Sequence, residues 1–495
     1  MLKTIPELEF LKYYWLALTV TTIGVLMAGI DTRIVIIGIP QVAEQLNADP
    51  EQVIWVTQSY VLASTVMLLL IGRLADIFGR TRIFTAGFAI FTIGSGLTSI
   101  GQDPIQVIIF RAIQGIGAAF ILTNSLAIVT DASPKNKLGL AVGINQISFR
   151  AGAIIGLTLS GLILSYLDWR ALFYINIPIG MFGTYWSNKK LKEIGYLDKN
   201  AKIDWVGFVA FFLFILNLLL SFTFSAYGLD QNRTIIYTFL AISSISLIAF
   251  LFQQRRERYP LLDLNIFKIR SFTGGILALL LNAIAWSAVL LLLSLEFQLT
   301  RNSTPLQAGI DIIPFELAFL TTGPLSGRLS DRFGHVPFTV SGLILSGIAL
   351  ILFYLTPSTA PYITFAVHMI IFGFGTGLFL APIMRTIMDS APPKRRGISS
   401  ATMFLFFNIG LTLSLNVALL TMSLTAPYTL ITQVITAIDP SKISASDIAL
   451  FSASLKTTYL WLAIINLLAL VPLSIIKRNK NFNNPKKSSK ELIEY

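Results

Sequence analysis

Three of the charged side chains that lie inside long apolar stretches are candidates for chemistry, because those stretches are long enough to cross a lipid bilayer. They are the carboxyl groups of Asp31 and Glu316 and the guanidinium group of Arg111. A charge at the centre of a membrane helix costs about 2.5–3.5 kcal/mol on insertion scales, so such a side chain faces a partner or a water-filled space. A carboxylate that is paired in one state and desolvated in another can bind and release a proton. These residues are therefore candidates for proton coupling.

The two acids have different expected surroundings. Asp31 and Arg111 should lie at similar depth, because the first apolar segment runs outward and the fourth runs inward, and Gln114 is one helical turn further along. A permanent structural pair is the alternative to proton coupling, and Arg33 is a competing partner that would keep Asp31 ionised. Glu316 has no basic residue near it in sequence, so burial favours its neutral form. The alternative for Glu316 is a hydrogen-bonded structural acid.

Other polar and aromatic positions in the apolar stretches are candidates for the wall of a substrate cavity. Aromatic cavities suit amphipathic ligands, although in a membrane protein such residues more often face lipid or other helices. Arg150 has two interpretations, an anchor for an anionic substrate group or a partner of Glu316 across the cavity. We expect Glu296 near the outer surface, in contact with solvent, and His368 in the core. The candidate lining residues are Arg33, Gln58, Gln114, Asn145, Gln146, Arg150, Asn282, Trp286, Phe315 and Asn408.

The composition is typical of an integral membrane protein. Hydrophobic residues make up 54% of the 495 residues and charged residues only 13%, against about 25% charged in an average soluble domain. Fourteen apolar segments have the length of a membrane span, about 17–25 residues, and all must be helical because lipid leaves no partner for an open sheet edge. The segments lie near 14–37, 52–72, 83–101, 105–129, 138–166, 170–187, 205–225, 234–253, 272–295, 307–327, 337–356, 362–388, 397–424 and 457–476.

Composition and motifs also exclude several classes of protein. The net charge is +12, but the basic residues lie mostly in loops, which argues against nucleic-acid binding. The chain has no cysteine, which excludes disulfides and thiolate metal sites. It contains no Gly-x-x-x-x-Gly-Lys-Ser/Thr sequence, so ATP is not expected to drive it. We expect no metal, no cofactor and no enzymatic activity.

A short motif occurs twice and divides the chain into two related halves. The first copy runs from Gly72 to Arg82 and the second from Gly327 to His335, and both follow the spacing Gly-x-Leu-x-Asp-x-x-Gly. We expect each copy to be a loop in which glycines permit a tight turn and close helix packing. Asp76, Arg80 and Asp131 should form a charge cluster that stabilises one of two conformations, and Asp331 with Arg332 should form a weaker one. The alternative is that these charges only set topology. The candidate gate residues are Gly72, Asp76, Gly79, Arg80, Asp131, Gly327, Asp331 and Arg332.

The repeated motif resembles the signature loop of the major facilitator superfamily, and further stretches resemble its fourteen-span drug:proton antiporter branch. The first span carries Asp31-Thr32-Arg33-Ile34-Val35, and the fourth opens with Arg111-Ala112-Ile113-Gln114-Gly115-Ile116-Gly117. The stretch 168–180 is similar to the entry to the sixth span in this branch. One departure lies in the fifth span, where Leu157 replaces the proline and Ser160 a glycine of the branch motif. A kink at that point is therefore not expected.

The resemblance implies an all-α fold of two six-helix bundles with two inserted helices, fourteen transmembrane helices in all. The first bundle should occupy 1–187, the linkers and inserted helices 188–270, and the second bundle 271–476, with an outer loop at 425–456 and a basic cytoplasmic tail at 477–495. Basic residues gather in alternate loops, which places both termini in the cytoplasm.

The expected function is that of a secondary active transporter, a proton-coupled antiporter that expels amphipathic or drug-like compounds by alternating access. We expect it as a monomer in the plasma membrane, with small molecules, protons and lipid as its partners. Two alternatives stay open. One is a transporter of a lipid, a siderophore or an organic anion, in which Arg33 and Arg150 contact the anion. The other is a membrane sensor without transport activity.

Overall fold

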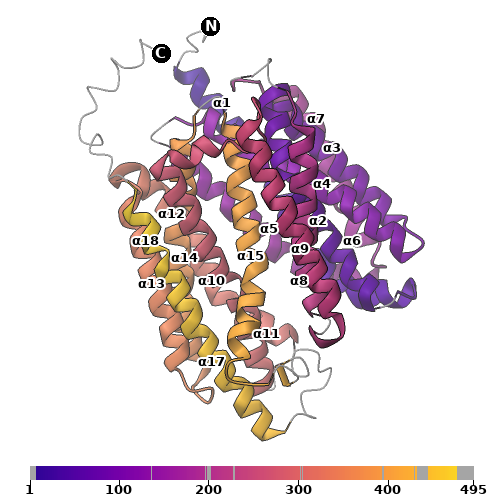
Figure 1. Cartoon of the computed structure of the whole chain (residues 1–495), viewed down its shortest axis with the longest axis vertical. Coiled ribbons are helices and arrows are strands. Elements are labelled where there is room, and N and C mark those ends of the chain that lie inside the picture. Colours follow the sequence, from indigo (N-terminus) through magenta and orange to yellow (C-terminus); the bar gives the residue numbers. More distant parts are fainter. Residues whose placement is uncertain are drawn as a thin grey trace.

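The computed structural model is an assembly of long helices that lie side by side (Figure 1). No strand occurs in the part of the chain that the structure describes. The described residues are 7–48, 50–134, 137–195, 197, 202–226, 229–301, 303, 305–392, 395–427, 430–431 and 444–476. The predicted basic tail 477–495 and most of the segment 428–443 lie outside them.

The helices follow the predicted apolar segments. The first half comprises α1 (Glu7–Gln45), α2 (Pro50–Phe78), α3 (Arg80–Ser99), α4 (Pro104–Ala132), α5 (Leu138–Tyr166), α6 (Ala171–Tyr174) and α7 (Asn176–Lys190). The middle comprises α8 (Trp205–Ala226), α9 (Leu229–Arg256) and the 3-10 helix η1 (Leu264–Lys268). The second half comprises α10 (Arg270–Arg301), α11 (Pro305–Asp311), α12 (Ile313–Phe333), α13 (Val336–Leu355), α14 (Tyr362–Ser390), α15 (Arg396–Met422), α17 (Ala445–Leu468) and α18 (Leu470–Ser474).

Eleven helices of the described residues are long and apolar enough to cross a membrane. The three other predicted spans, 83–101, 170–187 and 205–225, coincide with α3, with the short pair α6 and α7, and with α8, whose apolar part is Trp205–Ser221. Within the predicted outer loop 425–456, α17 begins at Ala445, and the candidate span there runs from Ser446 to Ser474.

Small residues bring neighbouring helices of the first half into backbone contact. A β-carbon added at Gly152 or Gly156 of α5 would collide with the carbonyl oxygens of Leu26 and Ile30 on α1. The glycines of the fifth-span motif thus serve the packing of α1 against α5, as small residues commonly do between membrane helices. Helix α5 runs unbroken from Leu138 to Tyr166, as expected without the proline.

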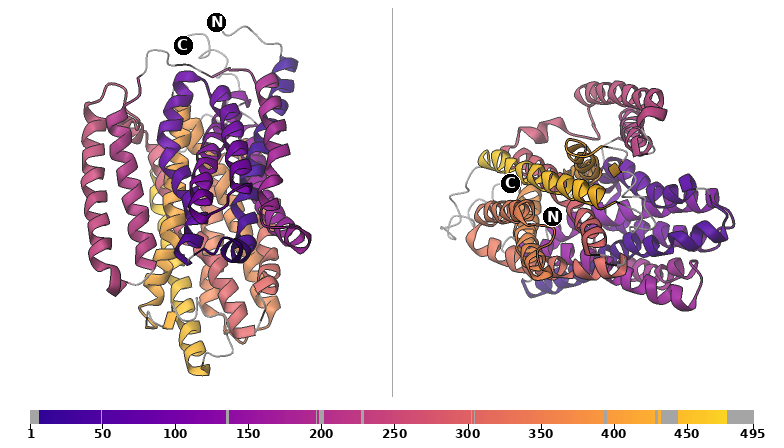
Figure 2. Two further views of the ribbon diagram at one scale, coloured as in Figure 1. Left: turned by 90° about the vertical axis from the view of Figure 1, so that its right-hand side faces the viewer. Right: turned by 90° about the horizontal axis from the view of Figure 1, so that it is seen from below.

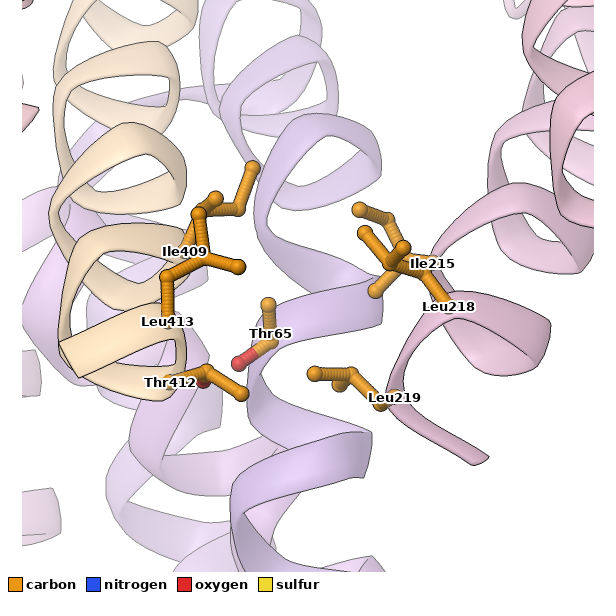
Figure 3. A pocket seen from close by; sticks show the side chains of 7 residues that line it. All are labelled: Thr65, Ile215, Leu218, Leu219, Ile409, Thr412 and Leu413. Carbon is orange, nitrogen blue, oxygen red and sulfur yellow. The ribbon is translucent and has the colours of Figure 1, made fainter. Parts of the chain in front are cut away.

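The two halves meet along two seams, α5 against α12 and α2 against α15. The inserted hairpin α8–α9 stands at the side of the molecule (Figure 2), where Phe211 and Ile215 share an apolar cluster with Leu69 of α2 and Ala401 of α15. Figure 3 shows the side chains that α2, α8 and α15 direct toward one another around a void of about 10 Å³. A void of that size holds about one water molecule. The hairpin therefore contacts the α2–α15 seam through apolar side chains.

Candidate functional site

The carboxyl group of Asp31 is completely buried within the first half, at 0% exposure. Its Oδ2 accepts a hydrogen bond from Nη1 of Arg111 at 2.7 Å. Its Oδ1 accepts from the amide nitrogens of Gln114 at 2.8 Å and of Asn176 at 3.0 Å. The predicted contact of Asp31 with Arg111, including Gln114, is confirmed, and α1, α4 and α7 each contribute to it. In this conformation Asp31 is held as a satisfied carboxylate.

The surroundings of the Asp31 cluster hold Arg111 in one orientation. The guanidinium lies 4.5 Å from the centre of the Tyr60 ring, and its Nε donates to the carbonyl of Val56 at 3.2 Å. Ser95 of α3 accepts from both Gln114 and Asn176 at 3.2 Å. Sequence reasoning missed Ser95 and Asn176 as members of the cluster. Asn176 lies within the stretch 168–180 that resembles the family, so that resemblance carried a usable signal.

A second charged pair joins the two halves. Nη1 of Arg150 on α5 donates to Oε2 of Glu316 on α12 at 3.1 Å. The guanidinium carbon also lies 3.7 Å from the ring centre of Phe319, 4.5 Å from that of Trp286 and 5.5 Å from that of Phe315. Arg150 was interpreted either as an anchor for an anionic substrate group or as a partner of Glu316, and in the structure it pairs with Glu316. Glu316 has no basic residue near it in sequence, and its partner comes from the other half of the chain.

Three amide residues proposed for a cavity wall lie inside one half of the molecule. Gln114 belongs to the Asp31 cluster and is 0% exposed. Asn145 exchanges hydrogen bonds with Ser125 between α5 and α4, and Asn282 donates to Asn466 between α10 and α17 at 2.9 Å. Their polarity serves contacts between helices of the same half.

The other proposed wall residues differ in exposure and in their contacts. Arg33 and Gln58 are exposed, and Gln146 is half-buried. Asn408 of α15 lies 3.4 Å from the hydroxyl of Thr65 on α2, across the seam. Together with the aromatic residues around Arg150, these positions make up the part of the predicted cavity set that stays compatible with a substrate.

The first motif copy forms a charge cluster across the α2–α15 seam. Asp76, near the end of α2, accepts from the backbone N–H groups of Gly397 at 3.1 Å and Ile398 at 3.2 Å, at the start of α15. Arg80 donates to Asp76 at 3.0 Å and also pairs with Asp131 of α4. Asp131 in turn pairs with Arg396 of α15 at 2.7 Å. The carboxylates thus occupy the positive end of a helix in the other half.

The second motif copy makes the same kind of contact across the α5–α12 seam, in which an aspartate accepts hydrogen bonds from the N-terminus of a helix. Asp331 accepts from the backbone N–H groups of Gly139 at 2.9 Å and Leu140 at 3.0 Å, at the start of α5. Its ion-pair partner is Arg385 of α14 at 2.8 Å. The proposed partner Arg332 is exposed and lies beside the ring of Phe333. The weaker cluster predicted from Asp331 and Arg332 is therefore corrected to Asp331 and Arg385.

The motif glycines act at two different places. Gly79 and Gly334 have φ values of 106° and 87°, a region that favours glycine. Gly79 alone separates α2 from α3, and Gly334 with His335 separates α12 from α13. Gly72 and Gly327 lie within helices, where an added β-carbon would collide with the carbonyl oxygens of Gly397 and Gly139 in the other half. The predicted loops are therefore mostly helix, with a turn of one residue in the first copy and two in the second.

Two further titratable groups lie in the second half. Glu296 of α10 is 3% exposed and accepts a hydrogen bond from the Tyr459 hydroxyl at 3.2 Å. The expectation that it is solvated is wrong, because it lies among the packed helices α10 and α17. His368 is 9% exposed and lies 3.2 Å from the hydroxyl of Thr356, which agrees with a histidine of the core.

A family profile described as Major Facilitator Superfamily matches residues 21–415. The chain belongs to the major facilitator superfamily. Members of the major facilitator superfamily are membrane transporters and not enzymes. The riboflavin transporter RibZ of Clostridioides difficile is 30% identical over 406 residues, which cover 81% of this chain and 87% of that protein. Multidrug resistance protein 3 of Bacillus subtilis is 28% identical over 397 residues, 80% of this chain and 77% of that protein.

Solved structures of the major facilitator superfamily share the fold. The proton:xylose symporter XylE has a TM-score of 0.64 at 15% identity, covering 93% of this chain and 95% of that one. The human organic anion transporter MFSD10 has a TM-score of 0.66 at 13% identity, covering 93% and 99%. At such identities the likeness establishes the fold alone.

Proposed function

We propose that this protein is a secondary active transporter that exchanges protons for amphipathic, drug-like compounds by alternating access. The proposal includes fourteen membrane spans in two six-helix bundles with α8 and α9 inserted between them. It also includes a monomer in the plasma membrane with both termini in the cytoplasm. Several relatives in this superfamily carry names of multidrug resistance or export, and these support a drug-like cargo.

The observation that carries proton coupling is the complete burial of Asp31 against Arg111. Breaking a buried ion pair leaves an uncompensated charge and is strongly unfavourable. If opening of the other face separates Asp31 from Arg111 or admits water, the carboxylate must gain a partner or a proton. Protonation of Asp31 would thus be tied to conformation, which is the requirement for exchange. Glu316 is proposed as a second proton-binding carboxyl, released when the halves part and Arg150 withdraws.

The direction of closure supports alternating access between two faces. Tyr13 near the start of α1 hydrogen-bonds the backbone of Lys192, which also accepts from Thr81 beside the Gly79 turn. Trp15 of α1 and Asp331 line one surface hollow, so both charge clusters across the seams lie at the end of the molecule where α1 starts. We infer that this end is the cytoplasmic one and that it is closed in the present conformation.

The test is flux into proteoliposomes under an imposed pH gradient, with rhodamine 6G as the probe. We expect dye movement that follows the gradient and is lost in Asp31→Asn. A matched control is Asp168→Asn, which removes a partly exposed carboxylate paired with Arg170 outside this cluster. Dye flux in Asp31→Asn that still follows the gradient would exclude Asp31 as the proton site. Dye flux through the unmodified protein that does not depend on the pH gradient would indicate a uniporter. The absence of flux for every cargo tested would indicate a sensor.

Riboflavin is a second candidate cargo, because the relative RibZ is a riboflavin transporter at 30% identity over most of both chains. The same proteoliposomes test it by riboflavin fluorescence. Riboflavin movement without rhodamine movement would replace drug efflux with vitamin transport.

A further inference from the structure

The surroundings of Arg150 contain hydrogen-bond donors that the protein itself leaves unused. Arg150 is 9% exposed and uses Nη1 for Glu316. Its Nη2 is buried and has no hydrogen-bond partner among the described residues, and the same is true of Nε1 of Trp286. Buried donors are nearly always paired in native proteins. Two such donors on neighbouring side chains, one of them charged, indicate a place for an acceptor from outside the chain.

The local charge favours an electron-rich acceptor. Arg33 is exposed, and its positive charge acts on Arg150, whose ion-pair partner is the carboxylate of Glu316. The net positive charge in a medium of low dielectric attracts anionic or carbonyl oxygen and repels cations. A guanidinium fork is also the protein donor best suited to planar oxygen groups.

The walls of the site favour a flat ring system. The rings of Trp286, Phe315 and Phe319 surround the guanidinium within 3.7–5.5 Å of its carbon. Trp286 is only partly buried, so part of its surface is free to contact a ligand. Aromatic side chains contact aromatic ligands in offset or edge-to-face arrangements. The lining thus combines two oxygen-directed donors with aromatic surface.

We propose that the Arg150–Trp286 site binds a planar aromatic molecule through a carboxylate or carbonyl oxygen, which accepts hydrogen bonds from Arg150 Nη2 and Trp286 Nε1. This inference rests on the proposed function, because it names the cargo class of the same transporter. It narrows that class from amphipathic compounds in general to aromatic compounds that carry oxygen acceptors.

The test is equilibrium dialysis of the purified full chain with 1-naphthoate and 1-naphthylmethylammonium, two probes of similar size and opposite charge. We expect naphthoate to bind about 10-fold more tightly, as a charge-assisted hydrogen bond provides. Trp286→Phe keeps an aromatic ring but removes the N–H, and it should weaken naphthoate binding about 5-fold without changing binding of the cation. Trp461→Phe on the exposed face of α17 is the matched control and should change neither.

Equal affinity for the two probes, or equal effects of Trp286→Phe and Trp461→Phe on naphthoate binding, would overturn the assignment. Arg150→Lys should also weaken naphthoate binding; if that variant does not fold, the Trp286 comparison still decides. Equilibrium binding separates this inference from the proposed transport. If the protein prefers naphthoate but shows no gradient-driven flux, the Arg150–Trp286 site is supported and proton exchange is contradicted. If it shows gradient-driven flux but no preference for naphthoate, proton exchange is supported and the Arg150–Trp286 site is contradicted.

Discussion

The two copies of the repeated motif make the same contacts with the backbone of the other half and differ in their charged side chains. In each, an aspartate near the end of one helix accepts from the first backbone N–H groups of a helix in the other half, Asp76 at α15 and Asp331 at α5. In each, a glycine of positive φ makes the turn. The duplicated part of the seam is thus a carboxylate at a helix N-terminus, an arrangement stabilised by the helix dipole.

The side chains around the two aspartates differ in number and in origin. Asp76 belongs to a cluster with Arg80, Asp131 and Arg396, whereas Asp331 has one ion-pair partner among the described residues, Arg385. The position of Arg80 is occupied in the second copy by His335. The α2–α15 seam therefore combines more charged contacts than the α5–α12 seam. We expect the first seam to contribute more to closure of this end.

The largest effect should come from Asp76→Asn. The substitution removes the charge that faces Arg80 and weakens the contact with α15, in a group that is 1% exposed. Loss of one partner of a buried pair costs about 3–5 kcal/mol, so the closed population should fall by more than about 10-fold. Cysteine is absent, so spin labels on Phe78→Cys and Phe333→Cys, exposed equivalent positions of the two copies, report the distance between the halves. If the distribution of spin-label distances is the same with and without Asp76→Asn, the α2–α15 seam does not control closure.

A smaller shift in the same direction should follow from Asp331→Asn. Fewer charged contacts are lost than in Asp76→Asn. A coupling free energy of about 1–3 kcal/mol changes the ratio of closed to open molecules roughly 5- to 150-fold, and we expect a change in the lower part of that range. Arg385→Gln should reproduce the shift, because it removes the ion-pair partner at 2.8 Å.

Arg332→Gln is the matched control for the second seam, since the side chain of Arg332 is exposed. It should leave the spin-label distances unchanged. A shift in Arg332→Gln as large as in Arg385→Gln would show that the second copy acts through its overall charge and not through one ion pair.

The sequence predicted the helices and the duplicated motif because both depend on local patterns. Apolar length and the glycine-aspartate spacing are properties of short stretches, and depth within two spans was enough to place Asp31 against Arg111. The pairing of Arg150 with Glu316 was one of two interpretations open from the sequence. That pair, the partner of Asp331 and the burial of Glu296 all depend on how distant helices pack. Arg332 was preferred to Arg385 because it adjoins Asp331 in the sequence. On a helix, however, neighbouring residues point about 100° apart.

The polar residues of the predicted spans also show that the sequence does not reveal which side chains line a cavity. Amide side chains in a membrane helix join other helices as readily as they line a water-filled path, and sequence alone does not distinguish the two. Asn145 and Asn282 belong to the first kind, whereas Asn408 lies across a seam. The distinction comes from the rotation of each helix within its bundle.

The smallest expected effect concerns His335, which stands where the first copy has Arg80. Burial, and then the charge of Arg385, lowers the pKa of His335 below its ordinary value of about 6.5. A histidine of lowered pKa stays neutral in the folded protein while the unfolded chain takes up a proton, so stability is complete above about pH 6.5 and declines as the pH falls below it. His335→Gln should remove this part of the decline in melting temperature between about pH 6.5 and 5, and change little at pH 7.5. The chain has only two histidines, and His368 is present in both proteins, so the difference between them reports His335. An identical decline in the two proteins would show that His335 carries no pH dependence, and the two seams would then differ only in their arginine and aspartate pairs.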